Sequence, residues 1–136
     1  MKNTRQLPLL LLLVAFTTMS FANPFAKPSE PNGILSLNTP HTSQDIFPVS
    51  LYEIDGKNIV SRSNAVWLKP GKHRLKMRAN VDLSYRSHAL LTRNKSLNKN
   101  NRILDITVED GKTYYIGYDT SNNNPNLWKP VIWKVK

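Results

Sequence analysis

Apolar and polar residues alternate along the stretch from Lys72 to Val81, and the rest of the chain is organised around it. Its odd-numbered positions, starting at His73, are mostly apolar, whereas its even-numbered positions are mostly Lys or Arg. Every second side chain of an extended strand lies on the same face. The pattern therefore predicts a strand with one buried face and one exposed, positively charged face.

A turn precedes this strand at residues 69–72, which have the sequence Lys-Pro-Gly-Lys. Proline fixes its own φ, and glycine accepts the positive φ that a type II turn requires. In a tight hairpin across this turn, Trp67 would lie opposite Arg74 on the exposed face. Type II turns match the twist of tight hairpins poorly, so a wider connection between two sheets is the alternative.

An Asp-Gly pair at residues 55–56 predicts a hairpin, because both residues tolerate the positive φ of a tight two-residue turn. Alternating residues at 49–55 lead into it, and the second strand follows at once. A short strand is expected earlier, at 34–38. Residues 39–48 are rich in turn formers and predict a loop.

A second Asp-Gly pair, at residues 110–111, predicts a hairpin over residues 103–119. A two-residue turn there places Glu109 opposite Lys112, which is a favourable pair of charges across two strands. One face of this hairpin is expected in the core, and its residues are Leu104, Ile106, Val108 and, across the hairpin, Tyr115.

The last strand is expected at residues 131–135, where apolar residues alternate again. Pro130 suits the first residue of an edge strand, because proline has no N–H to donate to a neighbouring strand. We assign Trp133 to the core together with Tyr115. The aromatic residues that could lie at the surface, where they could stack on sugars or bases, are Trp67, Trp128 and Tyr114.

About seven short strands with turns between them, and no convincing helix, predict an all-β fold consisting of a single antiparallel β-sandwich. The basic segment 86–102 lacks a second apolar row and is expected as a long loop. Three parts of the chain follow from these patterns. They are a signal peptide at 1–22, a proline-rich flexible arm at 23–33 and the sandwich domain at 34–136.

The first 22 residues have the features of an export signal. Lys2 and Arg5 precede an apolar run that is about half of the ~20 residues needed for a membrane span. Small residues at Ser20 and Ala22 match a cleavage site after Ala22. We therefore expect a periplasmic or secreted protein that keeps no transmembrane anchor after cleavage. The chain has no cysteine, which excludes disulfides, thiol nucleophiles and a lipoprotein anchor.

Positive charge is concentrated in one region. The chain has 19 Lys and Arg against 9 Asp and Glu, and the stretch from Lys69 to Arg102 holds ten of these cations and one acid. We expect a positive field that attracts lipopolysaccharide, acidic glycans, extracellular DNA or anionic lipid headgroups. The candidate ligand-binding residues are Trp67, Lys72, Arg74, Lys76, Arg78, Arg86 and Arg93. The alternative is that these charges only keep an outer strand face soluble and prevent aggregation between sheets.

Three turn motifs resemble a group of small exported bacterial domains, the PEGA-like and related β-sandwich modules. The motifs are Ile54-Asp55-Gly56-Lys57, the segment from Leu68 to Leu75 and the segment from Val108 to Ile116, so the likeness covers residues 49–119. The resemblance implies an immunoglobulin-like or transthyretin-like sandwich that serves as an accessory domain in the cell envelope, without catalytic residues. The basic segment 86–102 and the Trp-rich tail depart from the pattern of this group.

No residue pattern supports catalysis, a metal or a cofactor. The three histidines lie in separate segments without a close pair of ligands, and His73 is expected as an ordinary strand residue. We expect a non-enzymatic binding or accessory module. One alternative is a protein–protein module in envelope assembly that pairs through the edge strand 131–135. The other is a small envelope hydrolase using His41, Ser43 and Asp45, although neighbours on one loop are not held in triad geometry.

Overall fold

The computed structural model describes residues 23–60, 63–80 and 102–136, and within them nine strands form two sheets. The five-stranded sheet contains β1 (Gly33–Ser36), β2 (Ile46–Phe47), β5 (Ala65–Leu68), β8 (Thr113–Asp119) and β9 (Lys129–Val135). The four-stranded sheet contains β3 (Val49–Ile54), β4 (Lys57–Asn58), β6 (Gly71–Ala79) and β7 (Ile103–Val108). The prediction of an all-β fold is confirmed.

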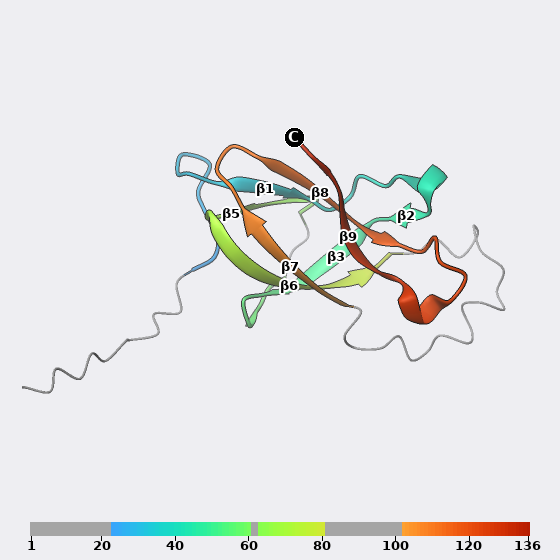
Figure 1. Ribbon diagram of the computed structural model, residues 1–136. Coiled ribbons are helices and arrows are strands. Elements are labelled where there is room, and N and C mark those ends of the chain that lie inside the picture. Colours follow the sequence, from blue (N-terminus) through green and yellow to red (C-terminus); the bar gives the residue numbers. More distant parts are fainter. Residues whose placement is uncertain (1–22, 61–62, 81–101) are drawn as a thin grey trace, which may run out of the picture.

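Helix is limited, in the described part of the chain, to two 3-10 turns, η1 (Thr42–Gln44) and η4 (Pro125–Leu127). Neither is long and apolar enough to cross a membrane. Figure 1 shows β6 and β7 side by side on one side of the molecule and β1 with β8 on the other. The predicted signal peptide at 1–22, the end of the central strand at Val81 and most of the basic segment lie outside the described residues.

Both sheets contribute side chains to one hydrophobic core. The alternation of β6 is confirmed, because His73, Leu75 and Met77 are buried and Lys72, Arg74 and Arg78 are exposed. From β7, Ile106 and Val108 are buried and Leu104 packs against the core, as predicted. The remaining core residues include Leu35, Leu51, Ile54, Val66, Leu68, Ile116 and Tyr118. Burial raises the pKa of the Tyr118 hydroxyl.

The Asp55-Gly56 hairpin is confirmed. Asp55 and Gly56 have φ values of 50° and 80°, and Ile54 pairs with Lys57 in the antiparallel β3–β4 ladder. Positive φ at both central residues is the geometry that matches the twist of two neighbouring strands.

The other two turns connect different sheets. The Pro70-Gly71 corner leads from β5 in the five-stranded sheet to β6 in the four-stranded sheet, so the wider connection is confirmed and the tight hairpin is wrong. Trp67 pairs with Ile34 of β1, whereas Arg74 pairs with Asp105 of β7. The proposed contact between Trp67 and Arg74 is therefore wrong.

The hairpin predicted at Asp110-Gly111 is also wrong, because β7 pairs with β6 and β8 pairs with strands of the other sheet. Gly111 has the expected positive φ, at 76°, whereas Asp110 does not have a positive φ. Glu109 forms the expected ion pair with Lys112. Asn32, just before β1, makes two hydrogen bonds to this turn. Its N–H donates to Asp110 Oδ1 at 3.0 Å, and its carbonyl accepts from Gly111 N at 2.8 Å.

A parallel pair of strands corrects the expectation of a fully antiparallel fold. Strand β1 runs parallel to β8, with Leu35 next to Tyr114 and Ser36 next to Tyr115. The arm before β1 also lies against the sheet, because Ala26 N donates to Trp67 O at 3.1 Å and Lys69 N donates to Pro24 O at 3.0 Å. Part of the predicted flexible arm thus adds to the edge of β5.

The burial of four aromatic residues differs from the prediction. Tyr114 and Trp128, expected at the surface, are buried, whereas Tyr115 and Trp133, expected in the core, are only half-buried. Trp67 is exposed, as expected. The wrong hairpin explains why Tyr114 and not Tyr115 is buried in β8, because a register error of one residue exchanges the two faces of a strand.

Candidate polyanion-binding face of β6

Four cations project from one face of β6, and the neighbouring strands decide which of them are neutralised. Lys72, Arg74 and Arg78 are exposed and Lys76 is half-buried. Their alternation with buried residues fixes them to the outer face of the four-stranded sheet. From Lys72 to Arg78 the row extends for about 20 Å at the usual rise of a strand.

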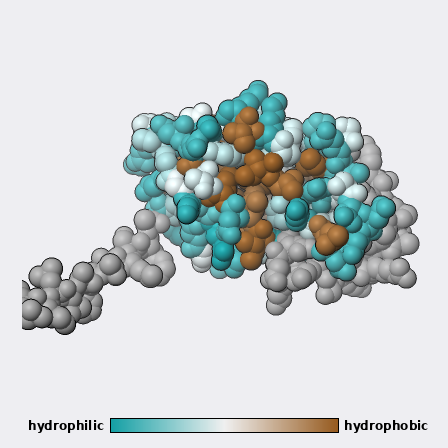
Figure 2. All heavy atoms as spheres, viewed as in Figure 1, coloured by the Kyte–Doolittle hydropathy of each residue, from teal (hydrophilic) through white to brown (hydrophobic). Residues whose placement is uncertain are grey.

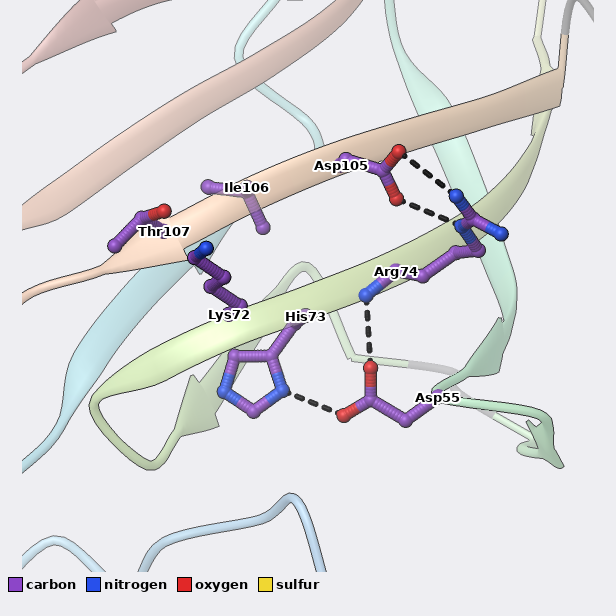
Figure 3. A pocket seen from close by; sticks show the side chains of 7 residues that line it. All are labelled: Asp55, Lys72, His73, Arg74, Asp105, Ile106 and Thr107. Atoms are coloured by element: carbon purple, nitrogen blue, oxygen red, sulfur yellow. Dashed lines mark hydrogen bonds and ion pairs between the residues drawn. The ribbon is translucent and has the colours of Figure 1, made fainter.

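Arg74 makes a bidentate ion pair with Asp105 on β7 (Figure 3). Arg74 Nε lies 2.8 Å from Asp105 Oδ1, and Nη2 lies 3.1 Å from Oδ2. The hydrogen bonds from Arg74 hold the pKa of the Asp105 carboxyl below its usual value, and Asp105 raises the pKa of Arg74. Both side chains are 63% exposed, so water screens the pair and a competing anion can reach it.

Lys76 is neutralised from the other side of β6. Its Nζ lies 2.8 Å from Glu53 Oε1 on β3, and the Glu53 side chain is 16% exposed. The β3–β6 ladder shifts register between Leu51 and Glu53, which places Glu53 directly opposite Lys76. A bulge of this kind re-aims a side chain, and the sequence pattern did not reveal it.

The two ends of the row have no carboxylate partner among the described residues. Arg78 lies over the ring of Tyr52, with its Cζ 5.2 Å from the ring centroid, which is a cation–π contact. Lys72 pairs across the sheet with Thr107. It borders a shallow depression of about 520 Å³ that is also lined by Arg74, Asp105 and Asp55 (Figure 3).

His73 lies beneath this depression and is held at both ring nitrogens. Its Nδ1 is 2.6 Å from Asp55 Oδ2, and its Nε2 is 2.7 Å from the carbonyl oxygen of Lys69. Asp55 Oδ1 also accepts a hydrogen bond from Arg74 N at 2.7 Å. His73 is thus more than an ordinary strand residue: it joins β6, the β3–β4 turn and the β5–β6 corner. The signal for this was a polar residue on a buried strand face, which must find partners.

The other predicted site residues do not join this face. Trp67 lies on β5 in the other sheet, beside an apolar cleft lined by Phe25, Ile59 and Val60 among others. Arg86 and Arg93 lie outside the described residues. The sequence therefore predicted the row on β6 but not its separation from Trp67.

The three residues of the hydrolase alternative, His41, Ser43 and Asp45, lie on the loop that includes η1. His41 Nδ1 lies 3.0 Å from Ser43 Oγ, and the His41 ring packs edge-on against Trp133 at 5.2 Å. Asp45 has φ of 58°, and its carbonyl accepts hydrogen bonds from the backbone N–H and hydroxyl of Thr120. In the described part of the chain, no group of three or more His, Asp or Glu residues is placed to hold a metal.

The site on β6 consists of four cations, the three carboxylates of Glu53, Asp55 and Asp105, and an open depression. Comparison of the chain with protein-family models, curated proteins and solved structures finds no match.

Proposed function

We propose that this chain is a non-enzymatic, exported accessory domain that binds anionic polymers of the cell envelope through the outer face of β6. The observation that carries the proposal is the row from Lys72 to Arg78, in which every second residue is a cation on one exposed strand face. The buried residues between them anchor the row to the core, so the charges are held in place without a ligand.

The charge of this face supports a polymer more than a single small anion. Glu53 and Asp105 neutralise two of the four cations, and Asp55 adds a third carboxylate beside the depression. The positive surplus is therefore carried by the two ends of the row, Lys72 and Arg78, which have no carboxylate partner among the described residues. The ends are about 20 Å apart along the strand. A chain with repeated phosphate, sulfate or carboxylate groups can reach both ends, whereas one small anion reaches only one.

Lipopolysaccharide, acidic glycans, DNA and anionic lipid headgroups share this chemistry. Binding of this kind depends on exposed charges, so salt weakens it. We therefore expect affinity for heparin, lipopolysaccharide and DNA to fall as the salt concentration rises. The relative affinities would identify the preferred source of the anionic groups.

The experiment compares two double variants that change net charge equally. Lys72→Glu/Arg78→Glu reverses the ends of the row, and Lys129→Glu/Lys134→Glu reverses two exposed lysines on β9. We expect the first variant to lose affinity for all three polymers by more than tenfold, about 1.4 kcal/mol, and the second to lose little. Equal losses in both variants would show that only net charge attracts the polymers, which would overturn the proposal.

We also propose that the two sheets form a β-sandwich and that the protein is exported. Two sheets that share one core are the arrangement of a β-sandwich, and the likeness to PEGA-like modules remains a prediction. Export remains a prediction as well. It is tested by N-terminal sequencing of the protein from a periplasmic or culture fraction, which we expect to begin at Asn23; a product that begins at Met1 would contradict it.

A further inference from the structure

We propose that the outer edge of β9 binds an extended acidic segment of another protein, which adds to the five-stranded sheet as a further strand. This interaction surface lies on a different sheet from the basic row of β6 and does not depend on the function proposed for that row. Four properties of β9 carry the inference. They are its position, its backbone, its apolar side chains and its charge.

Strand β9 is an edge of its sheet. It pairs with β8, and no other described strand pairs with it. Lys136 and Thr113 exchange both backbone hydrogen bonds, at 2.9 and 2.8 Å. Because the pairing direction alternates along an antiparallel ladder, the next residue, Val135, turns its N–H and C=O away from β8. Part of β9 lies beside β7 of the other sheet, but Val135 is exposed, so an added strand can reach its backbone groups.

Apolar side chains accompany this open edge. Val135 is 48% exposed, and Val131, Ile132 and Trp133 are half-buried. Figure 2 shows hydrophobic atoms gathered in the middle of the face on which Figure 1 places β9 and β7. An added strand would therefore find apolar contacts beside the backbone groups, as strand addition requires.

The exposed lysines at the edge of β9 favour an acidic partner segment. Lys129, Lys134 and Lys136 are exposed, and none of them forms an ion pair with a described residue. Lys134 instead lies over the ring of Tyr115, with Nζ 5.4 Å from the centroid. Pairing with a second copy of β9 would bring these lysines together, and like charges across strands are destabilising. A segment that alternates acidic and apolar residues complements both the lysines and the apolar positions.

Proline and a bulge restrict where the added strand can lie. Pro130 has no N–H and sits near the start of β9, so backbone pairing is expected only from Val131 onward. The β8–β9 ladder shifts register at Trp133, which interrupts regular pairing and makes the end at Lys134 and Val135 the main contact for an added strand. Lysines on an edge also discourage self-association. The same charges thus oppose a second copy of the chain and favour an acidic partner.

The probe is a nine-residue peptide that alternates Glu and Val, compared with a peptide of the same composition in which all Glu precede all Val. We expect the alternating peptide to bind and to shift backbone NMR signals of β9, and the block peptide to bind at least about tenfold more weakly. An alternating peptide that is N-methylated on one edge cannot pair and should not bind. Equal binding of all three peptides would overturn the proposal.

Variants locate the site on the protein. Val135→Pro removes an outward N–H while leaving the bonds of Lys136 to β8, and we expect it to weaken binding about tenfold. Val135→Ala keeps the N–H and is the matched control. Lys129→Glu/Lys134→Glu should abolish peptide binding while retaining binding to heparin, and Lys72→Glu/Arg78→Glu should do the reverse. Peptide-induced shifts on β6, or dimerisation through β9 in sedimentation, would contradict the inference.

Discussion

The side chain of His73 is joined to that of Asp55 by the short contact between Nδ1 and Oδ2, at 2.6 Å. The other ring nitrogen, Nε2, lies 2.7 Å from the carbonyl oxygen of Lys69. The buried His73 ring therefore has a hydrogen-bond partner at both nitrogens, as a buried polar group requires.

Removing the carboxylate should destabilise the fold. We expect Asp55→Asn to lower the free energy of unfolding by about 2–3 kcal/mol, because it leaves a buried polar ring without its charged partner. The matched control is Asp110→Asn in the other Asp-Gly turn, which removes an exposed charge but keeps an oxygen that can accept from Asn32 N, and it should cost less than about 1 kcal/mol. Urea unfolding at neutral pH measures both. Equal costs would show that the His73 contact contributes little.

Gly117 on β8 lies between β2 and β9, whose residues leave no space for a Cβ atom. A Cβ there would overlap Ile46 Cγ2 and lie 3.2 Å from Phe47 O and 3.3 Å from Trp133 Cδ1. We expect Gly117→Ala to lower the free energy of unfolding by about 1–3 kcal/mol through overpacking. The cost should be smaller in an Ile46→Ala background, where the overlapping atom is absent. The same cost in both backgrounds would point to another cause.

The same substitution should destabilise the fold much more at Trp128 than at Trp67. Trp128 is buried, and its Nε1 donates to Asn122 O at 2.7 Å. We expect Trp128→Phe to cost about 1–3 kcal/mol of unfolding free energy, because it leaves a cavity and removes a hydrogen bond. Trp67→Phe on the exposed face should cost less than about 0.5 kcal/mol. Denaturant unfolding followed by circular dichroism measures both costs. A larger cost for Trp67→Phe would contradict the burial of Trp128 and the exposure of Trp67.

Local patterns predicted the elements but not their partners. The alternation of β6 was readable because each buried residue is flanked by cations, and the Asp55-Gly56 hairpin was readable because the turn needs positive φ at both residues. The turn at Asp110-Gly111 has the same two residues, but only Gly111 has a positive φ. It joins two sheets, and β8 finds a parallel partner in β1. Pairing of distant strands is decided by the whole core and leaves no local signal.

The candidate site was predicted in part for the same reason. The four cations of β6 follow from periodicity, whereas their carboxylate partners lie on strands that are distant in sequence. Asp105 meets Arg74 through the β6–β7 register, and Glu53 meets Lys76 through a bulge. Trp128 was missed because the loop carbonyl of Asn122 satisfies its N–H, which alternation cannot reveal.

Asp105 should restrain polyanion binding. It occupies two donors of Arg74, and its exposed position lets a polyanion compete with it. We expect Asp105→Asn to release Arg74 from its ion pair and to increase heparin affinity severalfold. The slope of log K against log salt should become steeper by about one contact to an anionic group. Asp110→Asn changes net charge equally away from the row and is the control. An equal gain in both variants would assign the effect to net charge.

The salt dependence of binding to duplex DNA tests the basic face of β6 most directly. The slope of log K against log salt reports the number of neutralised phosphates, about 0.9 per contact. We expect Lys72→Glu/Arg78→Glu to reduce the slope by about two contacts and Lys129→Glu/Lys134→Glu to leave it unchanged. An unchanged slope in the first variant, or an equal reduction in both, would contradict binding through this face.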